Sequence, residues 1–87
     1  MMDAYGYIEV LGLVCAVTAA DAALKAANVE VVGKENTGAG MVAVIIKGEI
    51  GAVRAALDAA EDAVNRIGKV VHTNVIAKPD ASLQQLY

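Results

Sequence analysis

The spacing of hydrophobic residues changes at Gly12 and divides the first third of the chain into two elements. Along residues 4–11 the side chains alternate between two sides and are rich in aromatic and β-branched types, which predicts a strand. Beyond it, hydrophobic residues recur every three or four positions, as on one face of an α-helix. They are Leu13, Val17, Ala20, Leu24 and Ala27. Thr18 and Asp21 have the spacing of a capping box, so this helix is expected to begin at Thr18 or one turn earlier.

A hairpin is predicted in the middle of the chain. After Asn28, β-branched residues return and predict a second strand over residues 29–36. A third strand is predicted over residues 41–47, where a continuous hydrophobic run indicates burial on both faces. Between the two strands, the segment 37–40 contains two glycines, which favours a hairpin-type turn.

A second helix is the clearest element of the sequence. It is predicted to open at Gly48-Glu49 and to stop at Gly68, where a C-terminal glycine is expected. Its hydrophobic residues are spaced by three and four: Ile50, Val53, Leu57, Ala60, Val64 and Ile67. On the opposite face, four charged residues are spaced for ion pairs one turn apart: Arg54 with Asp58, and Asp62 with Arg66.

A fourth strand is predicted over residues 69–76, and Pro79 ends it. Asp80 is expected to cap a short C-terminal helix. The order β-α-β-β-α-β is the ferredoxin-like split arrangement, an α+β fold with two helices on one face of a four-stranded antiparallel sheet. Residues 1–87 are expected to form a single domain.

Composition adds an expectation about assembly. Hydrophobic residues make up 57% of the 87 residues and aromatic residues only 3%, whereas about 45–50% hydrophobic is usual. This content excludes disorder, and the longest hydrophobic stretches, residues 10–17 and 41–46, fall short of the roughly 18 residues of a membrane span. So short a chain cannot cover all of this surface by itself, so it is expected to be a protomer that packs against neighbouring copies.

Charge and cysteine content narrow the partners and the compartment. Seven Lys and Arg against ten Asp and Glu give a net charge of −3, and no basic cluster or aromatic platform is present to bind nucleic acid. The single cysteine favours a reducing compartment, and the first residues do not resemble a secretory signal. We therefore expect a cytoplasmic protein that binds neither nucleic acid nor membrane.

The candidates for chemistry are few. His72 is the single histidine, and it shares one face of the fourth strand with Asn74. No cysteine or second histidine is present beside it to complete a set of metal ligands. Cys15 lies early on the first helix without the paired histidine of a nucleophile. An acidic stripe on the second helix is best explained as a solvated face: Asp58, Glu61 and Asp62. The sequence therefore predicts no catalytic residue, no metal site, no cofactor and no enzymatic activity.

The segment Gly38-Ala39-Gly40 is the most suggestive element, because glycines allow the backbone to present N–H groups to a ligand. It lacks the Lys and Ser/Thr of a phosphate-binding loop, and it joins two strands instead of a strand and a helix. From these residues alone, an ordinary turn and a ligand-contacting turn both remain open.

Taken in order, segments over nearly the whole chain resemble the hexamer-forming shell proteins of bacterial microcompartments. The segments are 7–9, 20–29, 32–33, 37–40, 47–49, 66–68 and 75–79. The similarity is to the single-domain shell proteins of the ethanolamine- and propanediol-utilisation type, and carboxysome shell proteins are more distant relatives. The combination of a lysine-bearing helix, a glycine turn and a basic residue before proline carries this resemblance.

The resemblance implies cyclic homohexamers that tile edge to edge, with other shell proteins, into the facets of a shell around encapsulated enzymes. It implies a central pore for small polar metabolites, lined by Thr37, Gly38, Ala39 and Gly40. Relatives often carry Ser or Gly at the position of Ala39, so this chain lacks the hydroxyl contact that a serine would offer there.

The resemblance also implies contacts between hexamers at Lys25, Asn28, Lys78 and Pro79. Lys25 matches a lysine that lies against its counterpart across the edge, whereas without the resemblance it would be read as a solvated helix lysine. Lys78 stands where relatives commonly have arginine, and lysine cannot reproduce the planar arginine fork.

Two other function classes remain to be weighed. A small-molecule-sensing regulatory oligomer of ferredoxin-like type would bind an effector at a glycine turn between subunits. An enzyme of the small barrel-forming ferredoxin-like kind has less support, because the chain has one His, one Cys and no convergent acid pair.

Overall fold

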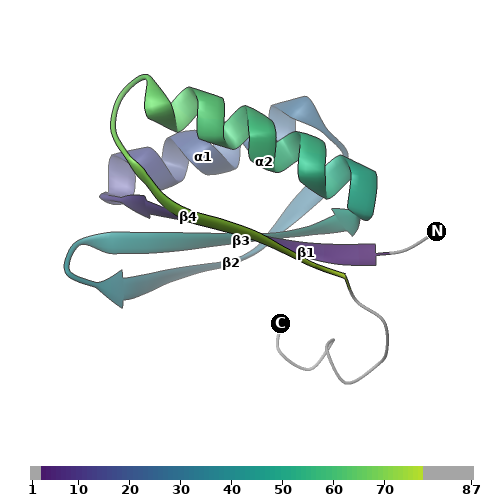
Figure 1. The fold of residues 1–87 in the computed structure, drawn as a ribbon, viewed down its shortest axis with the longest axis horizontal. Coiled ribbons are helices and arrows are strands. Elements are labelled where there is room, and N and C mark those ends of the chain that lie inside the picture. The colour runs from purple at the N-terminus through teal and green to yellow at the C-terminus, as the bar shows by residue number, and fades with distance from the viewer. Residues whose placement is uncertain (1–2, 78–87) are drawn as a thin grey trace.

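The computed structural model describes residues 3–77, and its elements follow the predicted order. They are β1 (Asp3–Leu11), α1 (Leu13–Ala26), β2 (Val29–Gly38), β3 (Met41–Glu49), α2 (Ile50–Asn65) and β4 (Val70–Ala77). The four strands form one sheet in the order β2-β3-β1-β4, and every neighbouring pair is antiparallel. Both helices lie on the same face of this sheet (Figure 1). The α+β arrangement predicted from the sequence is therefore confirmed, while the expected C-terminal helix lies outside the described residues.

Element boundaries differ from the predictions by a few residues. α1 begins at Leu13 after Gly12, which agrees with the earlier of its two predicted starts, so Thr18 lies inside the helix and caps nothing. β3 runs to Glu49, so Gly48 and Glu49 belong to the strand and not to the helix that follows. The Glu49 carboxylate accepts a hydrogen bond of 3.4 Å from the Ala52 N–H, which makes Glu49 the N-cap of α2.

The core is built from small and aliphatic side chains. α2 contributes Val53, Ala56, Leu57, Ala60 and Val64 to it, much as its hydrophobic spacing predicts. In β3 the side chains alternate: Val42, Val44 and Ile46 join the core under the helices, while Ala43 and Ile45 are buried with Tyr5 on the other face. The prediction that this strand is buried on both faces is confirmed. Within residues 3–77, no polar or charged residue is buried.

α1 buries a different face from the one that its hydrophobic spacing marks. Its buried residues are Cys15, Ala16, Ala19 and Ala23. Leu13, Val17 and Leu24 from the predicted stripe are at least half exposed, while Ala20 and Ala27 pack at the edge of the core. The predicted helix is therefore confirmed, but its larger hydrophobic side chains face away from the sheet.

The close contact between α2 and the sheet depends on Gly6 in β1. A Cβ at this position would lie 2.7 Å from Val53 Cγ1 and 2.8 Å from Ile46 Cγ1, closer than carbon atoms can approach. We expect Gly6→Ala to destabilise the fold by about 1–3 kcal/mol, because α2 must shift away from the sheet. Urea unfolding at fixed protein concentration measures this change.

Gly51→Ala is the matched control, because it makes the same substitution on the exposed first turn of α2. The new Cβ would meet only the end of the Glu49 side chain, at 3.2 Å from Oε2. We expect stabilisation of about 0.5 kcal/mol from the loss of glycine in a helix. Equal effects of the two substitutions would contradict the close contact at Gly6.

Candidate functional site

The segment 37–40 forms the tip of the hairpin between β2 and β3. Gly38 pairs with Met41, which leaves Ala39 and Gly40 as a two-residue loop. Their φ angles of 54° and 80° are those of a type I′ turn, the type that matches the twist of a hairpin. Ala39 is the one non-glycine residue with positive φ among those described, and its Cβ makes this conformation unfavourable by roughly 1–2 kcal/mol.

Two hydrogen bonds attach the turn to the rest of the molecule. The Gly12 N–H donates to the Gly40 carbonyl oxygen at 2.8 Å, which joins the turn to the corner between β1 and α1. The Thr37 hydroxyl donates to Glu9 Oε2 on β1. The N–H groups of Ala39 and Gly40 have no hydrogen-bond partner within residues 3–77. They are therefore available to a ligand or to solvent.

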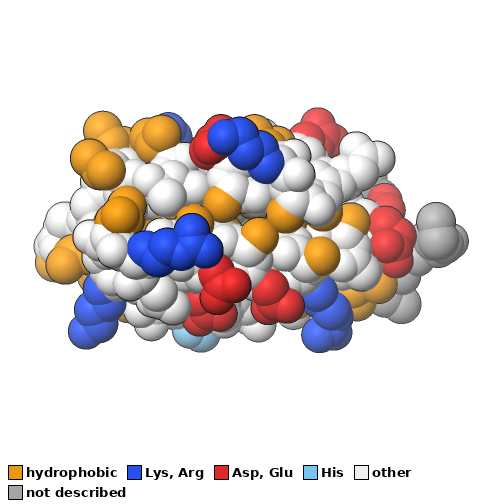
Figure 2. Space-filling model, turned by 90° about the horizontal axis from the view of Figure 1, so that it is seen from above, with side chains coloured by type: hydrophobic (Ala, Val, Ile, Leu, Met, Phe, Trp, Pro, Cys, Tyr) orange, Lys and Arg blue, Asp and Glu red, His pale blue; other side chains and the backbone are white. Residues whose placement is uncertain are grey.

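Exposed hydrophobic residues gather at the same end of the molecule as the turn. Leu11 closes β1, and Leu13, Val14 and Val17 follow on the first turns of α1; we call these four residues the α1 apolar surface. Leu13 is 62% exposed and Val14 is 73% exposed. In Figure 2, hydrophobic side chains are concentrated at the left end of the helical face, where Figure 1 shows the start of α1. Surface of this kind usually marks an interface between proteins.

Lys25 and Asn28 lie at the opposite end of α1. Lys25 is about 18 Å from Leu13 along the helix axis, at a rise of about 1.5 Å per residue. Its side chain is 75% exposed, and its Nζ lies 2.9 Å from Asp21 Oδ2. Asn28 lines a surface groove of about 600 Å³ with residues of β2, β3 and α2. Lys78 and Pro79, also predicted at this edge, lie outside the described residues.

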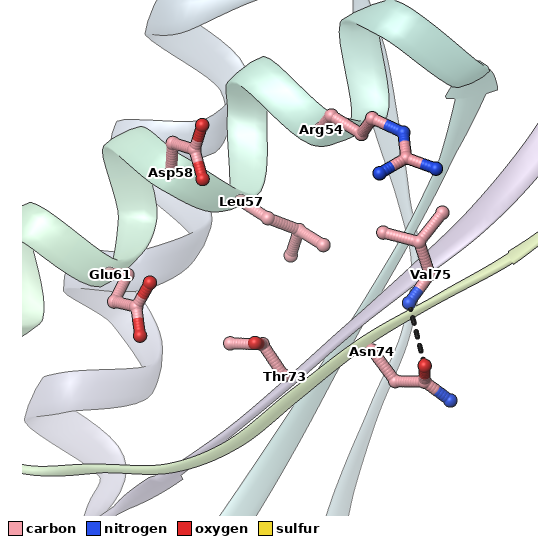
Figure 3. A pocket seen from close by; sticks show the side chains of 7 residues that line it. All are labelled: Arg54, Leu57, Asp58, Glu61, Thr73, Asn74 and Val75. Carbon is pink, nitrogen blue, oxygen red and sulfur yellow. Dashed lines mark hydrogen bonds between the residues drawn. The ribbon is translucent and has the colours of Figure 1, made fainter.

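A second groove, of about 450 Å³, runs between α2 and the edge strand β4 (Figure 3). Charged side chains from α2 line one side of it, and polar and aliphatic side chains from β4 line the other. They are Arg54, Leu57, Asp58, Glu61, Thr73, Asn74 and Val75. The one hydrogen bond drawn there joins the Val75 N–H to Asn74 Oδ1, 3.0 Å apart. Arg54 and Asp58 form no ion pair within residues 3–77, although their spacing predicts one.

The other candidates for chemistry stand apart from one another. His72 is exposed on β4, and its ring lies 6.1 Å from the Tyr7 ring in a tilted contact. Cys15 is buried beside Gly68, where an added Cβ would lie 2.5 Å from its Sγ. Among the described residues, no three His, Cys, Asp or Glu residues are grouped so that they could hold a metal ion. Neither α1 nor α2 has the length and hydrophobicity needed to cross a membrane.

The structure thus brings the four predicted pore residues together and separates them from Lys25 and Asn28. Sequence reasoning missed two features of the site. It assigned Leu13 and Val17 to the packed face of α1, whereas they are exposed. It also did not identify the bond from Thr37 to Glu9, because no local pattern connects residues that are 28 positions apart.

Comparison with known proteins gives a consistent result. Residues 4–79 match the BMC domain family. The bacterial microcompartment shell protein PduA of Salmonella typhimurium is 43% identical over 97% of this chain and 89% of its own length. EutM of Escherichia coli, also a bacterial microcompartment shell protein, is 40% identical over 99% of this chain and 89% of its own length. The carboxysome shell protein CsoS1 of Prochlorococcus marinus is 46% identical over 93% of this chain and 80% of its own length.

A solved structure agrees with the fold. The crystal structure of a microcompartments protein from Desulfitobacterium hafniense superimposes with a TM-score of 0.79 and 28% sequence identity. The alignment covers 87% of this chain and 41% of that longer chain. With a family match over most of its length and relatives at 40–46% identity, the chain belongs to the BMC domain family of bacterial microcompartment shell proteins.

Proposed function

We propose that this chain assembles into cyclic hexamers that tile edge to edge into the facets of a microcompartment shell, with the glycine turn at a central pore. Membership of the family makes the chain a structural component of the shell and not an enzyme, located with the microcompartment in the cytoplasm. The observation that carries the proposal is the polarity of α1. The turn and the α1 apolar surface lie at its start, and Lys25 lies at its far end.

A ring supplies the cover that the α1 apolar surface lacks in one chain. In a cyclic assembly each protomer uses two different surfaces, one for each neighbour. The flank formed by α1 and β2 differs in chemistry from the flank formed by α2 and β4, where the 450 Å³ groove lies. Two unlike flanks suit a head-to-tail ring.

A pore follows when six turns meet at the axis of such a ring. The Ala39 and Gly40 N–H groups, which lack partners within residues 3–77, would then point dipoles into a narrow channel. These dipoles favour polar or anionic solutes over hydrophobic ones. Around the pore, contacts at Lys25, Asn28, Lys78 and Pro79 would join hexamers to each other and to other shell proteins. Enzymes enclosed by the shell complete the proposed set of partners.

The ring is tested by Val14→Glu, which places a carboxylate in the α1 apolar surface. Burying an unpaired charge costs roughly 3 kcal/mol per interface, so we expect the hexamer to dissociate to smaller species. Native mass spectrometry or light scattering of the wild-type and variant proteins measures the change. Ala55→Glu adds the same charge at an exposed position of α2 that does not line the 450 Å³ groove, and it should leave the hexamer intact.

A wild-type protein that is a dimer or trimer, and that tightens when a metabolite is added, would contradict the ring. That result would favour the sensor class. If the hexamer persists unchanged with Val14→Glu, the α1 apolar surface is not part of the interface between protomers.

Contacts between hexamers are tested by Lys25→Ala. We expect hexamers to persist while extended sheets disappear, because the lysine is exposed and its pair with Asp21 adds only about 0.3–0.5 kcal/mol to the helix. Electron microscopy of concentrated protein reports the sheets. Asp21→Asn is the control, because it removes the same ion pair and keeps the lysine. Sheets that form normally with Lys25→Ala would exclude Lys25 from the edge.

The pore is tested by Ala39→Trp. A bulky side chain from each of six turns should occlude the opening, so uptake of a small polar solute by assembled shells should fall at least about tenfold. Ala39→Gly is the matched control, because it removes the methyl group and relieves the positive φ, and permeability should be retained or increased. Equal permeability of the two variants would show that the turn does not line the route.

A further inference from the structure

We propose that Glu9 is a positioning residue for the glycine turn, which it holds through the hydroxyl of Thr37. The inference deepens the proposed pore and rests on it where the effect on permeation is concerned. The bond itself joins β1 to the last residues of β2, two strands that are not neighbours in the sheet. A side chain on β1 would thus control the conformation of the turn between β2 and β3, through a residue of β2 that lies across β3 from it.

Thr37 lies at a bulge in β2. Asn36 pairs with Val42 and Gly38 pairs with Met41, so Thr37 is an extra residue without a partner on β3. An extra residue of this kind leaves the ladder locally unpaired. Thr37 is two residues beyond Glu35, which shares a row with Ala43 and Glu9, so alternation along β2 places its side chain on the Glu9 face of the sheet. The bulge lies directly before the turn, so a change in the position of Thr37 also changes the position of the turn.

A small residue on β3 opens the path between the two side chains. Ala43 pairs with Glu9 on one side and with Glu35 on the other, so it lies in the row that Glu9 must cross. Ala43 is fully buried, and its small methyl group leaves room for the Glu9 side chain to pass over β3. A longer side chain at this position would stand between the Glu9 carboxylate and the Thr37 hydroxyl.

The turn needs such support, because Ala39 holds a positive φ of 54° that its Cβ disfavours. A residue in that conformation persists only when its surroundings determine it. The Gly12 N–H bonds the far end of the turn at Gly40, and Glu9 bonds the near end at Thr37. A carboxylate acceptor makes the second bond stronger than one between neutral groups.

Within residues 3–77, the hydrogen-bond partner of the Glu9 carboxylate is the Thr37 hydroxyl. His72 pairs with Glu9 in register on β4 and turns its ring toward Tyr7 in the contact at 6.1 Å. Glu35, the other acid of the row, has no hydrogen bond to Thr37. The chain therefore offers a matched pair of acids, one bonded to the residue before the turn and one not.

Amide hydrogen exchange of Gly12 tests the proposal in the assembled wild-type protein and its variants. The Gly12 N–H is bonded to Gly40, so it becomes exposed when the turn leaves its place. Thr37→Val keeps the shape of the side chain and removes the donor, and we expect exchange at Gly12 to quicken by about fivefold or more. Thr37→Ser restores the donor and should return the rate to near the wild-type value.

A double-mutant cycle distinguishes a shared bond from two separate effects. If Glu9 and Thr37 act as a pair, Glu9→Leu, which removes the acceptor, combined with Thr37→Val will quicken Gly12 exchange no more than the stronger single change. Glu35→Leu is the control for the loss of a carboxylate and should leave the rate unchanged. Independent, multiplying effects of Glu9→Leu and Thr37→Val, or an unchanged rate with Thr37→Val, would overturn the proposal.

Permeability separates this inference from the proposed pore. With both correct, shells of Glu9→Leu should differ in permeability from wild type by about twofold or more and shells of Glu35→Leu should not, while hexamer mass stays constant. A protein that forms no hexamer would contradict the proposed function, yet the exchange experiment would still decide whether Glu9 holds the turn.

Discussion

Close approach of the helices to the sheet is the constraint on which this structure depends. With neither Phe nor Trp in the chain, the space between the layers is filled by alanine, valine and isoleucine, and Val53 of α2 packs directly over Gly6. Such a thin core admits Ala16, Ala19 and Ala23 from α1 but has no room for its leucines. The larger side chains of that helix are therefore left on the outside, where only another protein can cover them.

This constraint explains which part of the fold could be predicted. Alternation, helical spacing and glycine positions identify all six described elements, because each is a local consequence of side-chain period. The same reasoning selects the wrong face of α1. Hydrophobic spacing ranks Leu13 and Val17 above Ala16 and Ala19, whereas burial in this core is decided by size. Period alone cannot tell a core face from an interface between copies.

The candidate site divides in the same way. The glycines of the turn are visible in the sequence, because positive φ at consecutive positions favours glycine in any hairpin of this type. The bond from Thr37 to Glu9 is not visible, since it joins two strands that are not neighbours in the sheet and passes over the small side chain of Ala43. A shift in register of one residue would turn the hydroxyl away, and local patterns do not determine register so finely.

The two ends of α1 differ in chemistry, and this difference bears on how a flat assembly can grow. The end at the glycine turn is hydrophobic, so in the proposed ring the contacts there would be the stable ones. The end at Lys25 is charged and exposed, and contacts of that kind are weak individually and sensitive to salt. In the proposed shell, strong contacts at the axis and weak contacts at the rim would separate assembly into two steps, and a sheet built from weak edges would correct a misplaced tile before the shell closed.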